Sequence, residues 1–538
     1  MSTNFRPSGP IWSLGEYLKA RDSLVSAEKA LGYESLVERT PLESTAEEII
    51  YRLKEWEDRN VYGIKSDGSG HEAGHRFLHG LDLVSDSKLF EVATKAPKGC
   101  LLHCHYDCLL PPDTVLADAR KQPNLYIRSD VPLISAGLFA HALPQFGVFG
   151  QATPPAESNM FHETYVSGSW MRYSSFLRRF PGGAAKAETW LRKRMVLQPD
   201  DAYHPKQTVN GIWQHFIRAV TVIRSMLGYE TAYREHFRRA LWKFAQDGIM
   251  YAEIRVALNY GFAIKSDDGT RELKQREALQ ILQQVLREET PKIRATGHLF
   301  YGAKVIYACM RSSSRDAMLW CMDNCIEMKQ LFPNLICGFD LQGQEDTGYP
   351  LSFWIPDLLD MRAKITALNI DLPFILHAGE TLDHGGETDS NLYDAILLDT
   401  KRIGHGFSIT KHPLLMQICK ERQIAIETCP ISNEVLGLVP TTKSHHLPVL
   451  LANCVPCTVN SDDPGSWQAS MLSHDFYQAM MGSENMSLMG WRTLAEWSIA
   501  YSCNDEPMKN QMLSDYSEKW RKFCEWIVLT YDQDSSEE

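Results

Sequence analysis

Residues 373–464 contain four short apolar runs that end in polar residues: PFILHAGE (373–380), RIGHGF (402–407), IAIETCP (424–430) and PCTVNSDDP (456–464). Four earlier runs have the same form: CLLHCH (100–105), MYAEIRV (250–256), AKVIYAC (303–309) and LICGFDLQG (335–343). Short apolar runs bounded by polar clusters are typical of buried strands in a parallel sheet.

Helix-like segments separate most of these runs. In one of them the apolar residues fall on a single helical face: Ala278, Ile281, Leu282, Val285 and Leu286. Strand and helix repeated through eight strands is the pattern of a closed parallel barrel. We therefore predict an α/β chain whose main domain is a (β/α)8 TIM-type barrel.

The interval between the first two runs, from His105 to Tyr251, is much longer than the about 30 residues that a βαβ unit needs. We expect an insertion after the first strand, at about residues 109–210, that leaves from the catalytic end of that strand. It is either a lid, a partner-binding module or a passive excursion. The barrel with this insertion is assigned to residues 98–511.

The regions that flank the barrel are expected to be helical. Ser13 with Glu16, and Ser44 with Glu47, have the spacing of capping boxes ahead of apolar-periodic segments. Residues 1–97 are therefore assigned to a helical extension that either covers the barrel or joins two copies in a homodimer. Residues 512–538 are assigned to a terminal helix and an acidic tail, DQDSSEE.

Composition excludes several classes of protein. The 538 residues carry a formal net charge of −12, which argues against a nucleic-acid or anionic-membrane partner. The apolar-rich stretch 131–150 is interrupted by polar residues and prolines, so no membrane span is expected. The opening residues, MSTNFRPSGPIWSLGEY, lack the apolar run of a secretory signal. Together with thirteen cysteines, an odd number, this predicts reduced thiols and a cytoplasmic location.

His103 and His105 close the first run with one residue between them. Side chains at positions i and i+2 of a strand share a face, so both imidazoles can point into the barrel mouth. On this pair alone, a shared metal ion and two satisfied core histidines are equally open.

The ends of other runs favour the metal. His377 closes the fifth run, His405 the sixth, and Asp462 with Asp463 the eighth. The carboxyl ends of barrel strands meet at one rim, where barrel active sites lie. Three neutral imidazoles and one carboxylate suit a zinc ion and leave room for a water molecule. Glu380, three residues after His377, is close enough to act as a proton shuttle.

Six motifs resemble the adenosine/AMP deaminase family: KGCLLHCHYD, GFDLQGQED, HAGE, RIGHGF, ETCPISNEVLG and VNSDDPGSW. The resemblance covers roughly residues 98–477, with the motifs in the family's order. The strings GFDLQGQEDTGYP and ETCPISNEVLGLV are most similar to the adenosine deaminase 2-like branch, also called adenosine deaminase-related growth factors.

The resemblance implies one zinc ion per chain, with the ligands His103, His105, His377 and Asp462. It also implies that His405 orients and deprotonates a water molecule, that Glu380 donates a proton to the purine N1, and that Asp463 holds N7. The backbone amide of Gly343 would meet N3, and Asp107 would lie near the ribose hydroxyls. The implied reaction is hydrolysis of adenosine, and of 2′-deoxyadenosine, to the inosine counterpart and ammonia.

The preference between a nucleoside and a nucleotide stays open. A carboxylate at Asp107, near the 5′ position, disfavours a phosphate. Glu345, counted among the substrate-binding candidates, and Asp346 add negative charge near Gly343, unless one of them only braces a loop. A basic cluster in the insertion either meets phosphates or forms a solvated helix face: Arg172, Arg178, Arg179, Lys186, Arg192, Lys193 and Arg194. A deaminase of a phosphorylated or N6-modified adenine nucleotide (AMP, ADP or ATP) is therefore one alternative.

Two further alternatives are a protein without catalytic activity and a hydrolase with a different substrate. A catalytically silent signalling or binding relative would usually have lost at least one functional residue, whereas Glu380, His405, Asp463 and all four candidate ligands are present. Secreted members of the branch carry a signal peptide and a disulfide in the insertion; the sequence has neither pattern, so we do not expect an extracellular growth-factor role. A metal hydrolase acting on another cyclic amide or aminopurine is also permitted, but the Glu380 and Asp463 pair suits a purine better.

Overall fold

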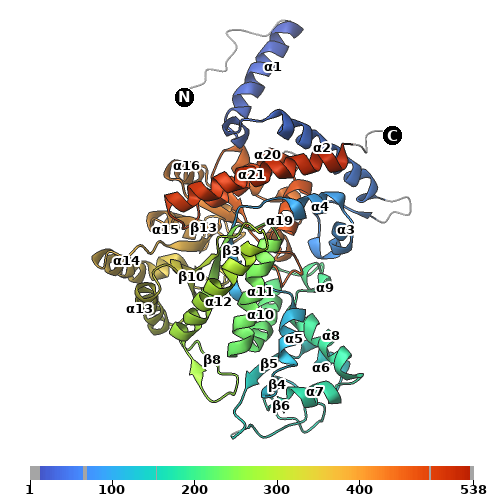
Figure 1. Ribbon diagram of the computed structural model, residues 1–538, viewed down its shortest axis with the longest axis vertical. Coiled ribbons are helices and arrows are strands. Elements are labelled where there is room, and N and C mark those ends of the chain that lie inside the picture. The colour runs from blue at the N-terminus through green and yellow to red at the C-terminus, as the bar shows by residue number, and fades with distance from the viewer. Residues whose placement is uncertain (1–12, 65–69, 153, 484–485, 533–538) are drawn as a thin grey trace.

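The computed structural model of the protein describes residues 13–64, 70–152, 154–483 and 486–532 (Figure 1). Parallel strands at its centre form two four-stranded sheets. The first sheet contains β3 (Cys100–His105), β7 (Tyr251–Ala257), β10 (Ala303–Met310) and β11 (Ile336–Gln342). The second contains β12 (Ile375–Ala378), β13 (Arg402–His405), β14 (Ala425–Thr428) and β15 (Cys457–Val459). Each of these strands overlaps one of the predicted runs.

Two isolated parallel bridges close the sheets into one barrel. Cys104 in β3 pairs with Asp462, three residues after β15, and Phe339 in β11 pairs with Phe374, just before β12. The predicted (β/α)8 fold is thus confirmed. Because all strands run in the same direction, the ends of β3, β12 and β13 and the segment after β15 meet at one rim.

Helices surround the barrel because each buries one apolar stripe against it. In α12 (Gln275–Ala295), four residues of the predicted stripe, from Ala278 to Val285, are buried, and the fifth, Leu286, is partly buried against the core. The following helices are α13 (Arg315–Leu331), α14 (Leu351–Ala367), α15 (Asn391–Leu397), α16 (Pro413–Arg422), α17 (Pro430–Val435), α18 (Leu447–Ala452), α19 (Ser473–Met481) and α20 (Leu488–Ala500).

The segment between β3 and β7 contains a small antiparallel sheet of strand order β5–β4–β6. Its strands are β4 (Leu125–Ser129), β5 (Pro144–Val148) and β6 (Met171–Arg172). The helices of the segment are α5 (Pro112–Ala119), α6 (Ala136–His141), α7 (Tyr173–Arg179), α8 (Gly183–Met195) and α9 (Pro199–Ala202). Except for α9, these elements lie in the lower part of Figure 1, and α10 (Val209–Met226) and α11 (Glu230–Gln246) return from them to the barrel.

The N-terminal region is helical, as predicted, but one predicted helix start is wrong. Helix α1 (Leu14–Lys29) has the predicted capping box of Ser13 and Glu16. Helix α2 (Pro41–Asn60), however, begins three residues before Ser44, with a capping box made by Thr40 and Glu43. The fixed φ of Pro41 suits the first helical position and sets this start. The predicted partner of Ser44, Glu47, instead accepts a hydrogen bond from the Arg39 guanidinium at 2.6 Å.

Helix α1 projects from the body of the protein at the top of Figure 1 and buries none of its residues. Helices α3 (Leu81–Ser85) and α4 (Lys88–Lys95) lead into β3, and α21 (Glu506–Tyr531) ends the described chain beside α2. The predicted acidic tail lies outside the described residues except for Asp532. Within the described ranges, every helix is too short or too polar to span a membrane.

Candidate active site

Four histidines converge at the rim where the strands end. His103 and His105 come from β3, His377 from β12 and His405 from β13. The ring of His103 lies 4.6 Å from that of His377, 4.7 Å from that of His405 and 5.4 Å from that of His105, measured between centroids. Imidazoles this close can share one ion.

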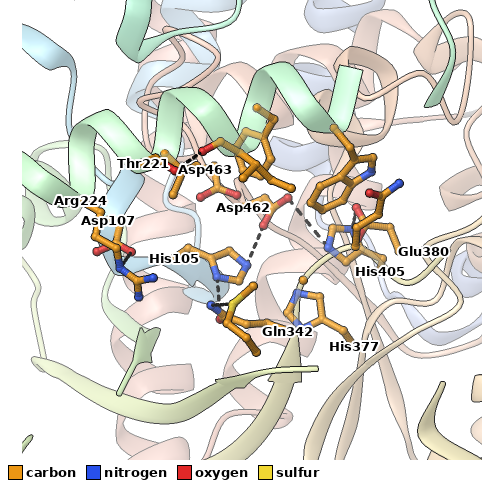
Figure 2. A pocket seen from close by; sticks show the side chains of 17 residues that line it. His105, Asp107, Thr221, Arg224, Gln342, His377, Glu380, His405, Asp462 and Asp463 are labelled. Atoms are coloured by element: carbon orange, nitrogen blue, oxygen red, sulfur yellow. Dashed lines mark hydrogen bonds and ion pairs between the residues drawn. The ribbon is translucent and has the colours of Figure 1, made fainter. Parts of the chain in front are cut away.

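Asp462 is held beside these rings by the bridge that closes the barrel. Its backbone N–H donates to the His103 carbonyl at 3.1 Å, and its carbonyl accepts from the His105 N–H at 3.0 Å. Asp462 Oδ1 lies 3.0 Å from His105 Nε2 and 3.4 Å from His103 Nε2, and Figure 2 shows the first of these contacts. Asp462 and His405 have φ values of +57° and +58°. This conformation is disfavoured for residues with a β-carbon and recurs at functional sites.

Each candidate histidine ligand has its Nδ1 tied to an acceptor. His103 Nδ1 lies 2.8 Å from Glu427 Oε2, His377 Nδ1 lies 2.6 Å from Asp340 Oδ2, and His105 Nδ1 lies 3.1 Å from Gln342 Oε1. An amide oxygen and the oxygens of an ionised carboxylate can only accept, so each Nδ1 must donate. The proton is then on Nδ1, and each Nε2 keeps a lone pair for a metal.

Buried arginines keep the two carboxylates charged. Burial alone would raise the pKa of Glu427, but Arg255 and Arg402 hold it well below its usual range. Arg255 bridges Asp340 and Glu427, with N–O distances of 2.6 and 2.7 Å. Burial would likewise raise the pKa of Asp340, but His377 and Arg255 lower it. Without a charged partner, these buried carboxylates would destabilise the folded state.

The donor set fits a metal ion. His103 Nε2 and Asp462 Oδ1 are both buried, face each other at 3.4 Å and make no hydrogen bond of acceptable geometry within the described residues. Buried polar atoms normally have a partner, and an ion bound between these two would supply it. Burial also lowers the pKa of His377 to about 3, so its imidazole is neutral, as metal ligation requires.

A chain of hydrogen bonds fixes the tautomer of His405. The Leu447 N–H donates to His445 Nδ1 at 3.2 Å, and His445 Nε2 therefore donates to Asn433 Oδ1 at 2.9 Å. Asn433 then presents Nδ2 to His405 Nδ1 at 3.3 Å. Burial lowers the pKa of His405 well below its usual range. Neutral His405 thus carries its proton on Nε2, which points toward Asp462 Oδ2 at 3.9 Å.

Glu380 follows a tight turn at Gly379, whose φ is +82°. The backbone N–H groups of Gly379 and Glu380 both donate to the Glu345 carboxylate, at 3.1 and 2.9 Å. Burial, followed by the charges of Asp462 and Glu345, raises the pKa of Glu380 well above its usual range. The Glu380 carboxyl therefore holds a proton that it can donate.

Glu345 was predicted to touch substrate, but its position differs from that prediction. It is buried and is absent from the cavity lining, because its oxygens accept from the Gly379–Glu380 turn and from Asn391. Glu345 therefore positions Glu380 from behind.

A cavity opens above the histidines, and α10 forms one of its walls. The lining residues of α10 recur at helical spacing on one face: Trp213, Phe216, Ile217, Val220, Thr221 and Arg224. Gly343, Asp463 and Asp107 also line the cavity. Burial and the charge of Asp462 raise the pKa of Asp463 well above its usual range, so this carboxyl is also a hydrogen-bond donor.

The basic cluster of the insertion lies away from the cavity, which agrees with its alternative as a solvated helix face. None of the seven predicted basic residues lines the described cavity. Arg192, for example, pairs with Asp113, and Arg172 donates to the Pro123 carbonyl and the Tyr126 hydroxyl. The arginine that does line the cavity is Arg224, which pairs with Asp107 (Figure 2).

Sequence reasoning missed the acceptors behind the histidines and the arginine on α10. One signal was available: Asp340 in GFDLQG and Glu427 in IAIETCP are charged residues inside otherwise apolar strands. Such residues are rarely buried without a partner. Arg224 carried no comparable signal, since it lies between the predicted insertion and the second predicted strand, where the sequence predicted no element.

The chain is similar to known deaminases. A protein-family profile described as "Adenosine deaminase" matches residues 194–519. An adenosine deaminase of Lutzomyia longipalpis is 32% identical over 512 residues, which cover 95% of this chain and 93% of that protein. Adenosine deaminase 2 of Sus scrofa is 29% identical over 475 residues, covering 88% and 87%.

Solved structures share the fold at lower identity. The adenine deaminase from Arthrobacter aurescens has a TM-score of 0.53 at 20% identity and covers 79% of this chain and 99% of its own. The N6-mAMP deaminase of arabidopsis has a TM-score of 0.54 at 17% identity, with 80% and 99% covered.

Proposed function

The chain belongs to the adenosine deaminase family, and from this premise we propose that it is a zinc-dependent hydrolase that converts adenosine, and 2′-deoxyadenosine, to the inosine counterpart and ammonia. The observation that carries the proposal is the orientation of three imidazoles. His103, His105 and His377 each donate from Nδ1 to an acceptor behind them and leave Nε2 free on the side of Asp462.

One zinc ion per chain would be held by His103, His105, His377 and Asp462. Bound there, zinc supplies a Lewis acid that makes water nucleophilic at neutral pH. The acceptors Glu427, Gln342 and Asp340 keep the three rings oriented before the ion arrives, and such partners typically change metal affinity about 10–100-fold.

The other site residues are proposed to act on the purine. Glu380 holds a proton for N1 of the ring, which weakens aromaticity at the carbon that is attacked. Asp463, also protonated, would donate to N7, and the Gly343 N–H would meet N3. His405 was expected both to orient and to deprotonate water; the proton on its Nε2 favours the orienting role, as a donor.

The test is direct. Purified protein with zinc is expected to convert adenosine to inosine, with one ammonia released per inosine, and to lose this activity when a chelator strips the metal. Liquid chromatography of the nucleosides, an ammonia assay and elemental analysis should be run on the same sample. Protein that holds one zinc per chain and turns over neither adenosine nor any adenine nucleotide would instead favour a silent relative.

We also propose a homodimer formed through helix α1. This helix buries nothing, yet it exposes Leu14, Tyr17, Leu18, Leu24 and Val25, with exposed fractions of 73, 52, 47, 52 and 38%. Exposed apolar residues gathered on one helix mark an association surface. The alternative that this extension covers the barrel does not apply to α1, which projects away from it (Figure 1).

Light scattering after gel filtration should therefore give twice the 61.2 kDa chain mass. Leu14→Glu combined with Leu18→Glu is expected to give the monomer, whereas Lys19→Glu on the same helix keeps the dimer. If the wild-type protein is a monomer at micromolar concentration, the proposed homodimer is wrong. The cytoplasmic location stays a prediction of the sequence.

A further inference from the structure

The cavity has a buried end and an open end. The side chain of Glu380 at the buried end is 2% exposed, whereas the side chains of Arg224 and Asp107 are 40 and 21% exposed. Figure 2 shows the Arg224–Asp107 pair and the Glu380–His405 pair on opposite sides of Asp462 and His105. A ligand that fills the cavity from Glu380 outward therefore extends toward Arg224.

The next step rests on the proposed function. If the purine lies against Glu380 and Asp463, the sugar and its 5′ substituent extend toward the open end. The groups that face this substituent are the Asp107 carboxylate and the Arg224 guanidinium, whose Oδ2 and Nε lie 3.2 Å apart. Unpaired, Asp107 would repel a phosphate; paired with Arg224, its charge is offset.

The contacts that Arg224 makes within the described residues leave part of its guanidinium available to a ligand. Its Nε faces Asp107 and its Nη2 donates to the Ala257 carbonyl at 3.3 Å, while Nη1 makes no hydrogen bond within the described residues. A guanidinium offers five N–H donors in a planar fork that matches a phosphate. Among the described residues that line the cavity, Arg224 is the only arginine, and no lysine is present.

We propose that Arg224 is a specificity-determining residue that admits a 5′-phosphate, so that the site takes adenosine 5′-monophosphate as a substrate alongside adenosine. Position supports this assignment. Arg224 is the last member of the α10 stripe that faces the cavity, one turn beyond Thr221.

The experiment compares kcat/KM for adenosine 5′-monophosphate and for adenosine in zinc-loaded wild-type protein and in four variants. Wild type is expected to deaminate the nucleotide with kcat/KM no more than about tenfold below the nucleoside. Arg224→Gln should lower the nucleotide-to-nucleoside ratio by about 10–100-fold, the loss expected for charge-assisted hydrogen bonds to a phosphate. Asp107→Asn should raise the ratio, because it removes the carboxylate that competes for Arg224.

Arg218→Gln is the matched control. Arg218 lies on the same helix, but its guanidinium donates to the His141 carbonyl and does not line the cavity. The nucleotide-to-nucleoside ratio of kcat/KM in Arg218→Gln should equal that of wild type.

Arg224→Lys keeps the positive charge without the planar fork of the guanidinium. Its nucleotide-to-nucleoside ratio should fall between those of wild type and Arg224→Gln. Calorimetry with the product should agree: inosine 5′-monophosphate should bind more tightly than inosine to wild type, and this gain should disappear in Arg224→Gln.

The outcomes separate this inference from the proposed function. Turnover of adenosine without the nucleotide, or an Arg224→Gln ratio equal to that of wild type, would overturn the role of Arg224 and leave the deaminase standing. In either case Arg224 would only neutralise Asp107. No turnover of either substrate by zinc-loaded protein would instead remove the proposed function itself.

Discussion

Asp462→Asn is expected to abolish metal binding and deamination together. Asp462 is the one carboxylate among the four proposed ligands, and an asparagine amide neither carries the negative charge nor matches its affinity for zinc. Loss of a Lewis acid that contributes several kcal/mol should lower kcat/KM at least about 10³-fold. Zinc content and adenosine turnover should be measured on the same preparation.

Asparagine is the better replacement because of the backbone at this position. Asp462 has a φ of +57°, which asparagine tolerates better than other residues with a β-carbon. Asp462→Ala should lose the same functions but adds backbone strain of about 1 kcal/mol, so a loss of activity in that variant could also reflect the fold.

Stripped wild type is the control for folding. A ligand that binds only the folded state raises its stability, so zinc added to stripped wild type should raise Tm. The same addition should leave Asp462→Asn unchanged, while the two metal-free proteins should unfold at similar temperatures. Asp462→Asn that retains one zinc per chain and near-normal turnover would show that this carboxylate is not a ligand.

The barrel could be predicted from the sequence because its strands carry a local signal. CLLHCH and RIGHGF contain both a buried strand and the residues at its end, so their type and their position at the rim follow from a few neighbours in sequence. The start of α2 shows the limit of such signals. Thr40 with Glu43 and Ser44 with Glu47 have the same spacing, and only Pro41 between them distinguishes the true start.

The residues behind the histidines could not be predicted in the same way. That His103 in β3 meets Glu427 in β14, and that His377 in β12 meets Asp340 in the neighbouring strand β11, depends on how the strands are arranged and staggered in the closed barrel. The pairing of Arg224 with Asp107 depends on a helix that leaves the insertion and returns across the barrel mouth. These contacts join residues far apart in the chain, and no local pattern specifies them.

Glu380→Gln is expected to keep the metal and lose most of the turnover. The glutamine side chain has the same shape as the glutamate side chain. The backbone N–H of residue 380 still donates to Glu345, so the turn should keep its position. What is lost is the proton that burial and the neighbouring charges of Asp462 and Glu345 hold on the Glu380 side chain. General acid catalysis typically contributes about 10²–10⁴-fold, and kcat should fall by that amount while KM changes by no more than about threefold.

Glu387→Gln provides the matched comparison, because Glu387 is an exposed glutamate in the same loop. It should keep wild-type kcat, KM and zinc content, so that any loss in Glu380→Gln is specific to the buried carboxyl. The split between kcat and KM distinguishes proton donation from positioning, since a glutamate that only held the purine in place would raise KM when changed. Equal kcat values in the two variants, with zinc present in both, would mean that the proton reaching the ring comes from another group.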